Sequence, residues 1–289
     1  MWKTYSQDGR WPIEKLYLSF SELEKKFGWL VEKIYEQKVG EASLPILGLR
    51  TGKEGQALWL IAGIHGEEPA GPNGFAQNIE FLGKLGKKMP VVLLPLCNPS
   101  GYLQDWRYPN EYRNEKKGKS VSDSSHLLPD LKSPTKPRTK KPACPEAKAL
   151  TSWVIKFSKK YEPQLVIDFH EDEDKKDEAF YIYFLGKQGA DDPVAGKIVK
   201  ILINHGFSIQ MQGKTRFGEK IKNGIVANIS DGSIDELLAA KKIIFKGKVV
   251  KGPSAERVVT VETSTVGTAL EKRIKAHSEV LRSVEKFWR

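Results

Sequence analysis

Runs of apolar residues, many of them β-branched and bounded by glycine, recur along the first third of the chain. They cover residues 46–49, 58–64 and 91–96, and from Ala57 to Ile64 every residue except Gly63 is apolar. A nearly continuous apolar run predicts a strand that is buried on both faces, as in a parallel sheet. Further upstream, Ser21 and Glu24 have the spacing of a capping box, which predicts a short helix beginning near residue 21.

Helix-like and strand-like patterns alternate through the rest of the chain. The predicted helices begin after Glu68 and cover residues 145–160, 194–204 and 268–287. The further predicted strands cover residues 165–169, 180–185, 243–250 and 257–261. This alternation predicts an α/β fold in which a twisted, mixed, largely parallel sheet carries helices on both faces. Ligands of such sheets bind beyond the carboxyl ends of the strands.

Composition narrows the class of protein. Of the 289 residues, 39% are hydrophobic and 29% are charged, so the chain can fill a core and solvate its surface. The length suits one large domain or two modest ones, and we expect a single domain over residues 1–289. No apolar run reaches the roughly 18 residues of a membrane span, and residues 1–20 lack the pattern of a secretory signal. The two cysteines, Cys97 and Cys144, could pair, but so few do not indicate an oxidising compartment, so we expect a cytoplasmic protein.

Positive charge is concentrated in one segment. The formal net charge is +11, and many of the basic residues lie in a Pro/Ser/Lys-rich insertion at about residues 113–145. This insertion is either a solvated loop or an electropositive rim that attracts acidic substrates. A polyanion-binding module is the non-enzymatic alternative, but the chain lacks zinc-knuckle, RNA-binding and helix-turn-helix patterns, so we do not expect a nucleic-acid partner.

Three predicted strands are followed by residues that can carry chemistry. After the first come His65 and Glu68, whose spacing can bring an imidazole and a carboxylate to one ion, while Glu67 is expected to point elsewhere. Nearby glycines allow the backbone to turn sharply and to approach a ligand. The second strand contains Asp168 and ends at His170, and residues two apart lie on the same face of a strand. Asp168 could therefore support a metal-bound His170.

The third strand ends at Glu262. A glutamate that closes an otherwise apolar strand is costly unless it is solvated or used. Two histidines and one glutamate, with a fourth position for water, are a ligand set of catalytic zinc peptidases. If Glu262 lines the same mouth of the sheet, it can act as a general base.

The order of these motifs resembles that of the zinc carboxypeptidase family. The motifs are His65-x-x-Glu68, Asn98-Pro-Ser-Gly101, Asp168-Phe-His170 and Val261-Glu262-Thr263. The family includes digestive-type carboxypeptidases, bacterial murein-peptide amidases and the related aspartoacylase and succinylglutamate desuccinylase branch. The resemblance extends from about Val31 to the C-terminus and is poor between Arg113 and Pro145.

The resemblance implies a fold and a set of roles. The family fold is a mixed, twisted sheet of eight strands between helices. His65, Glu68 and His170 are then expected to bind one Zn²⁺, and Glu262 to act as the base. Arg107, which follows the Asn98-Pro-Ser-Gly101 turn, is expected to polarise the scissile carbonyl and to stabilise the oxyanion, a role that suits a permanently charged guanidinium.

The chain departs from the family where substrate is bound. Many members carry an Asn-Arg pair that grips the terminal carboxylate of the substrate, but the matching region, residues 118–126, has none. Arg113 or Lys116, or the neighbouring lysines, could bind an anionic group instead. Asn98 and Ser233 are further candidates, and residues 228–233 are expected to border the substrate.

The sequence therefore predicts a cytoplasmic, zinc-dependent hydrolase that cleaves an amide bond in a peptide, with an anionic substrate expected. An N-acyl amino acid deacylase is the enzymatic alternative. We assign no catalytic role to the other histidines. His126 lies in the insertion, either at the surface or on the substrate side. His205 lies at a helix end, and His277 lies on the last helix, where we expect it to be exposed.

Overall fold

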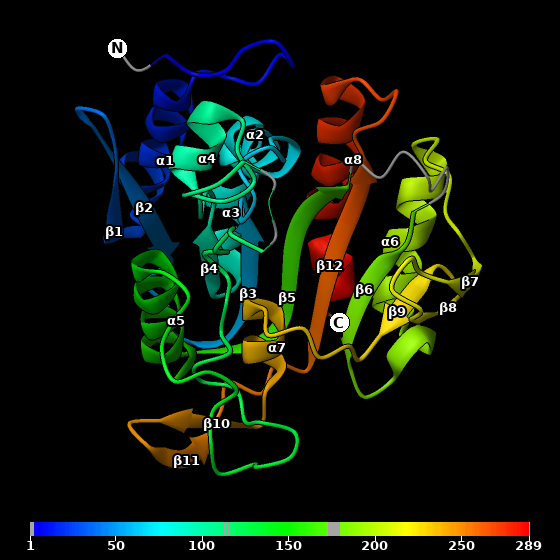
Figure 1. Cartoon of the computed structure of the whole chain (residues 1–289). Helices are drawn as coiled ribbons and strands as arrows, with labels where there is room; N and C mark the ends of the chain where they lie inside the picture. Colours follow the sequence, from blue (N-terminus) through cyan, green and yellow to red (C-terminus); the bar gives the residue numbers. More distant parts are fainter. Residues whose placement is uncertain (1–2, 113, 115, 173–179, 289) are drawn as a thin grey trace.

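A mixed sheet of ten strands organises the part of the chain that the computed structural model describes, residues 3–112, 114, 116–172 and 180–288 (Figure 1). The strand order is β1-β2-β4-β3-β5-β12-β6-β9-β8-β7. Neighbours are parallel from β4 to β12 and in the pair β6–β9, and antiparallel elsewhere. The strands are β1 (Leu30–Val39), β2 (Ala42–Arg50), β3 (Gly55–Ala62), β4 (Val91–Leu94), β5 (Tyr161–Asp172), β6 (Ile182–Gly186), β7 (Gln212–Lys214), β8 (Lys220–Lys222), β9 (Ile225–Ala227) and β12 (Arg257–Ser264).

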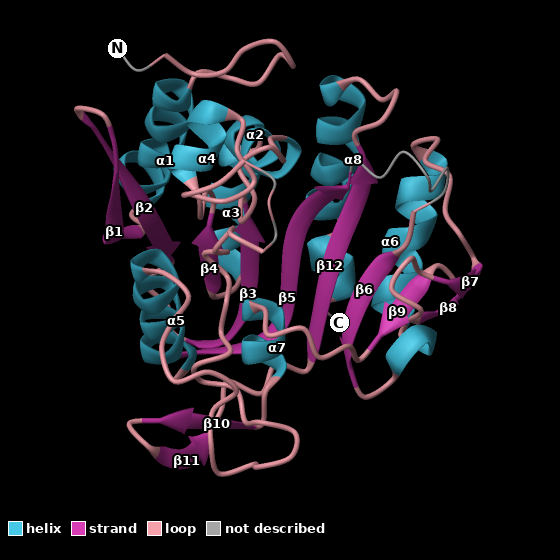
Figure 2. Ribbon diagram, in the orientation of Figure 1, coloured by secondary structure: helices cyan, strands magenta, loops and turns pink. Residues whose placement is uncertain are grey.

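Helices cover both faces of the sheet (Figure 2). One face packs against α1 (Ile13–Phe27), α2 (Ala70–Gln77), α3 (Ile79–Lys88), α6 (Pro193–Asn204), α8 (Leu270–Arg282) and α9 (Val284–Phe287). The other face packs against α5 (Pro145–Ser158) and α7 (Ile234–Ala239). The short helix α4 (Pro99–Gln104) follows β4, and a 3₁₀ turn, Gly189–Asp191, precedes α6. Among the described residues, no helix combines the length and the apolar character that crossing a bilayer requires.

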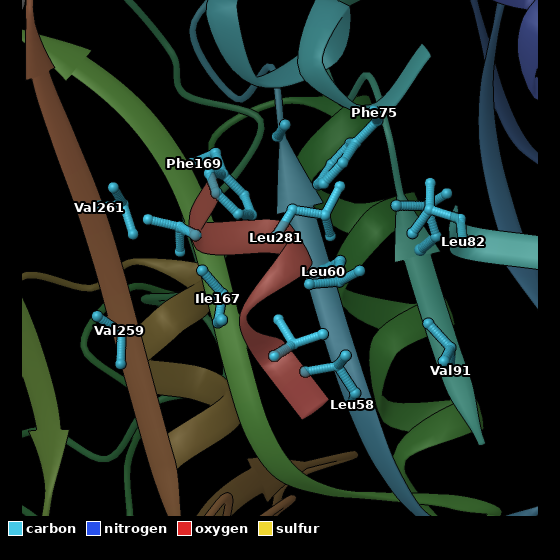
Figure 3. Packing of buried hydrophobic residues seen from close by; sticks show 14 of the residues in the cluster. Leu58, Leu60, Phe75, Leu82, Val91, Ile167, Phe169, Val259, Val261 and Leu281 are labelled. Atoms are coloured by element: carbon cyan, nitrogen blue, oxygen red, sulfur yellow. The ribbon is translucent and has the colours of Figure 1, made fainter. Parts of the chain in front are cut away.

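Alternation along the central strands divides the core into two layers. In β3, Leu58 and Leu60 belong to the layer that contacts α2 and α8, whereas Trp59 and Ile61 belong to the layer that contacts α5 and α7. Figure 3 shows the first layer, where Phe169 of β5 lies near Phe75 of α2. Because the strands are buried on both faces, their sequences read as continuous apolar runs. The ionisable side chains Asp168 and His170 of β5 and Glu262 of β12 lie in the second half of each strand.

The predicted α/β class, with helices on both faces, is confirmed, but the sheet has ten strands rather than eight. It is also less parallel than expected, because antiparallel neighbours flank its parallel centre. The additional strands have little hydrophobic patterning: β7 and β8 are three residues long and mostly exposed. Their pairing depends on backbone hydrogen bonds at the sheet edge rather than on a buried face, so the sequence carries no strong signal for them.

Two local predictions were wrong. The first helix begins at Ile13, directly after Pro12, and the Ser21 hydroxyl donates to the Leu18 carbonyl within this helix instead of capping it. Residues 243–250 do not form one strand. They form the hairpin β10 (Lys242–Phe245) and β11 (Lys248–Lys251), because Lys246 and Gly247 both have positive φ and turn the chain back on itself.

The basic insertion is partly built into the fold. Residues 121–128 include the buried Val121, Ser124 and Leu128, and the Ser124 amide donates to the Gly232 carbonyl at 2.7 Å. Arg138 forms an ion pair with Glu236 of α7. The expectation of a solvated loop therefore holds for exposed lysines such as Lys132, Lys136, Lys140 and Lys141, and not for residues 121–128. Cys97 and Cys144 are both free thiols.

The first turn of α2 lies very close to the sheet. A β-carbon placed on Gly71 would come within 2.8 Å of the Ala62 β-carbon and 2.9 Å of the Phe169 β-carbon. Neither neighbour is the flexible end of a side chain, so a larger residue would push α2 away from β3 and β5. Gly196, in the first half of α6, has no such neighbour within 4 Å.

We therefore expect Gly71→Ala to destabilise the protein by about 1–3 kcal/mol, as overpacking does. Gly196→Ala is the matched control, and it should be neutral or stabilising by up to about 1 kcal/mol because alanine favours the helix. Urea denaturation followed by circular dichroism measures both. Equal stability of the two variants would contradict the close approach described here.

Candidate metal centre

Three side chains converge beyond the carboxyl ends of the central strands. The Nδ1 atom of His65 lies 2.7 Å from Oε1 of Glu68, and Nδ1 of His170 lies 2.8 Å from Oε2 of the same carboxylate. The imidazole centroids are 5.0 Å apart. One potential ligand atom from each residue lies within 4.8 Å of the other two. Residues 102 positions apart are therefore placed around a volume that one metal ion can occupy.

The register of the sheet explains this convergence. β3 and β5 are parallel, with Ala62 opposite Phe169. The residues that follow these two positions, which include His65 and His170, therefore lie at the same edge of the sheet. His65 lies in the turn between β3 and α2, which begins with positive φ at Gly63. Within that turn, a β-carbon on Gly66 would come within 2.0 Å of the Gly101 backbone, so the loop could not close with a larger residue there.

Neighbouring groups fix the protonation of the candidate ligands. Burial, together with the positive charge of Arg107, lowers the pKa of His65 to about 4, so its ring is neutral and able to bind a metal. Although burial opposes ionisation of Glu68, the two imidazoles hold the pKa of this carboxyl well below its ordinary value. Oδ2 of Asp168 lies 3.0 Å from Nε2 of His170, so Asp168 can orient that ring, whose Nδ1 faces Glu68 at 2.8 Å.

Glu262 stands beside His170. β12 is parallel to β5, and the register places Glu262 opposite His170 and Thr260 opposite Asp168. The Oε2 atom of Glu262 is buried and has no hydrogen-bond partner among the described residues. Burial raises the pKa of this carboxyl well above its ordinary value. An unsatisfied buried carboxylate oxygen is costly unless a ligand or water meets it, so this atom is a candidate proton acceptor.

Arg107 reaches the same site from the segment after α4. Its Nη1 lies 2.9 Å from Oε1 of Glu67 and 3.2 Å from Oε1 of Glu68. Glu67 belongs neither to the three-residue cluster nor to the cavity lining, in line with the expectation that it points elsewhere, and its buried side chain holds the Arg107 guanidinium in place. Burial and the charge of Glu68 raise the pKa of Glu67 to about 7.

A cavity of about 530 Å³ opens in front of these groups. His65, Glu68, His170, Arg107 and Glu262 all line it, and so does the predicted border loop through Ile229, Asp231, Gly232 and Ser233. Ser120, Ser122 and Asp123, from the region that lacks an Asn-Arg pair, line it too. The cavity size falls within the range typical of small-molecule sites.

The candidate substrate residues are placed very differently. Ser233 lines the cavity. It is the N-cap residue of α7, and its hydroxyl accepts a hydrogen bond from the Glu236 amide. Asn98 is fully buried outside the cavity lining, where it accepts the Gly101 amide and donates to the Arg107 carbonyl. This geometry gives Asn98 a structural role in holding α4 and Arg107. Lys116 is exposed and does not line the cavity, and Arg113 lies outside the described residues.

Asp235 is a cavity residue that the sequence analysis did not identify. Its carboxylate accepts a hydrogen bond from the Thr260 hydroxyl at 2.7 Å, while Oδ1 is buried without a partner among the described residues. Burial and the charge of Asp168 raise the pKa of Asp235 to about 8. The local signal was weak, because Asp235 lies in the first turn of a six-residue helix rather than at a strand end.

The other histidines lie outside the cavity lining. His277 is buried, which corrects the expectation of an exposed ring: its Nε2 lies 3.1 Å from the Thr263 hydroxyl and its ring packs on Phe169. The many charged residues of α8 suggested an exposed helix, but α2 covers the face of α8 that carries His277. His126 and His205 are only partly buried, and His205 ends α6 as expected.

Comparison with known proteins identifies the fold. A protein from Shewanella amazonensis that has been proposed to be a metallopeptidase superposes with a TM-score of 0.73 at 20% sequence identity, covering 95% of this chain and 92% of that one. The carboxypeptidase A of Helicoverpa armigera superposes with a TM-score of 0.59 at 14% identity, covering 99% of this chain and 74% of that one.

Sequence comparison adds less. Carboxypeptidase 2 of Trichophyton rubrum is 38% identical over 58 residues, which are 18% of this chain and 11% of that relative. No protein-family model matches the chain. The structural likeness, which extends over almost the whole chain, nevertheless agrees with the ordered motifs of the sequence. The chain has the metallocarboxypeptidase fold.

Proposed function

We propose that the protein is a zinc-dependent hydrolase that cleaves an amide bond in a peptide. The observation that carries this proposal is the convergence of His65, Glu68 and His170, with Glu262 in register beside His170. Glu262 is therefore next to the candidate ion site without being part of the three-residue cluster. Such an arrangement separates metal binding from proton transfer.

The donor set fits zinc. Two imidazole nitrogens and one carboxylate are three of the ligands that catalytic zinc sites use, and a fourth position is left for water or substrate. Glu68 accepts a hydrogen bond from the Glu171 amide at 3.1 Å, and Asp168 orients the His170 ring. Two of the three candidate ligands are therefore held in position by neighbouring groups that are not ligands themselves. When bound, zinc would supply a Lewis acid that polarises a carbonyl and lowers the pKa of water.

The protein groups divide the remaining work. Glu262 takes a proton from the attacking water and delivers it to the leaving amine, and its buried position makes it a stronger base than an exposed glutamate. Arg107 stabilises the negative charge that develops on the carbonyl oxygen. Because Glu67 already holds the guanidinium, little reorganisation is needed when that charge appears.

The cavity does not support a preference for anionic substrates. Its lining includes nine acidic residues but only two arginines, Arg107 and Arg216, and the exposed Lys116 is elsewhere. The acids are Glu68, Asp123, Asp168, Glu171, Asp172, Glu219, Asp231, Asp235 and Glu262. We therefore propose a peptide substrate without assigning it a negative charge, and N-acyl amino acids remain the alternative substrates.

Metal binding tests the first part of the proposal. The wild-type protein, equilibrated with Zn²⁺ and dialysed, should retain one equivalent, measured by elemental analysis. His170→Ala should lose it, because two ligands bind zinc far more weakly than three. His205→Ala, at the end of α6, is the control and should retain the full equivalent. One equivalent in the His170 variant would remove this residue from the site.

Glu262→Gln tests the base. The amide keeps the size of the side chain but cannot accept the proton, so kcat for peptide hydrolysis should fall about 10²–10⁴-fold. The zinc content should stay at one equivalent. The matched control is Glu256→Gln, an exposed position near the start of β12, which should leave kcat unchanged. Unaltered turnover in the Glu262 variant would assign the proton transfer to another group.

A substrate panel separates the two enzymatic alternatives. We expect higher kcat/KM for short peptides with acidic, neutral or basic C-terminal residues than for N-acetyl derivatives of the same amino acids. A preference of tenfold or more for the N-acetyl derivatives would favour the deacylase. The same panel shows whether the acidic lining disfavours the peptides that end in an acidic residue.

A further inference from the structure

We propose that Arg273 of α8 is a positioning residue for the metal ligand Glu68, and that it acts through Glu171. This inference rests on the proposed function, since it concerns how the candidate zinc site is held. Arg273 is 103 positions from the nearest candidate ligand in sequence, His170, and does not line the cavity. Its influence on the site must therefore pass through another residue.

Glu171 is bonded to both sides of the Glu68 loop. Its backbone amide donates to Oε2 of Glu68 at 3.1 Å, and its own Oε2 accepts the Ala70 amide at 2.7 Å. Ala70 is the first residue of α2, two positions after Glu68. One residue of β5 thus fixes the carboxylate that faces the ion and the backbone that follows it.

Arg273 fixes the Glu171 carboxylate in turn. Its Nη1 bonds Oε1 of Glu171, which leaves Oε2 for Ala70, and both side chains are buried. A buried carboxylate without a partner would be strongly disfavoured, and it would also repel the negative charge of Glu68. The ion pair thus keeps Glu171 in one rotamer and neutralises its charge, so that Glu171 supports Glu68 rather than competing with it for the metal.

The packing of α8 on α2 sets the position of Arg273. Leu270 and Ile274, on either side of it, form a small buried cluster with Ala70. One turn further along, Gly74 of α2 has no side chain where it meets His277 and Ser278. Helices α2 and α8 are therefore in close contact along their length. This contact places the Arg273 guanidinium beside the start of α2.

Zinc affinity, measured by competition with a chromophoric chelator, tests the inference. In the full-length protein, Arg273→Met should raise the Kd for Zn²⁺ about tenfold or more, the range found when groups supporting metal ligands are removed. Arg273→Lys keeps the charge and should restore most of the affinity. The absorption spectrum of the Co²⁺-substituted protein should change with Arg273→Met, because it reports the geometry of the ligands.

The control must show that a lost ion pair alone is not the cause. Arg257→Met removes the Arg257–Asp192 pair at the other end of β12 from Glu262. It should lower the melting temperature of the metal-free protein but leave the zinc Kd unchanged. If Arg273→Met fails to fold, Glu171→Gln breaks the same pair from the other side at constant size, and it should also weaken zinc binding.

The outcomes are distinct. A zinc Kd within twofold of wild type in Arg273→Met, or in Glu171→Gln if only that variant folds, would overturn the inference and leave the proposed function standing. An equal loss of affinity in Arg257→Met would also overturn it, because the effect would then follow stability alone. A wild-type protein that binds no zinc would overturn the proposed function and the inference together.

Discussion

The buried carboxylate of Glu68 is the constraint on which the site depends. Burying a charged carboxylate is unfavourable unless its oxygens are satisfied. Here His65 and the Arg107 guanidinium meet Oε1, while His170 and the Glu171 amide meet Oε2. These partners come from the turn after β3, the segment after α4 and the end of β5. Satisfying one carboxylate therefore requires that three distant parts of the chain be correctly placed.

The central strands and their ends could be predicted because burial on both faces leaves a clear trace in sequence. The near-continuous apolar runs of β3, β5 and β12 predicted the strands. The polar residues near or just after their carboxyl ends, His65, His170 and Glu262, were recognisable as candidates. The spacing of His65 and Glu68 then indicated a shared ion. The register that places Glu262 opposite His170 could not be read from the sequence, because it depends on which strands are neighbours.

Other features of the structure have no recognisable pattern in the sequence. Strands β7 and β8 are short and exposed, so their residues resemble a loop. His277 is buried in a helix with many charged residues, and only its contact with α2 and Phe169 explains why. Asp235 and Glu67 have polar side chains in ordinary polar contexts, and their roles arise from Thr260 and Arg107, which are far away in sequence.

The order of the strands has a consequence for biosynthesis. Of the ten strands in the described part of the chain, β12 is the last to be synthesised, yet it lies between β5 and β6, near the middle of the sheet. Until residues 257–264 are available, the strands β6 to β9 have no hydrogen-bonded neighbour in the amino-terminal half of the sheet. A nascent chain that stops short of β12 therefore also lacks Glu262, so the strand that joins the two parts of the sheet also completes the candidate site.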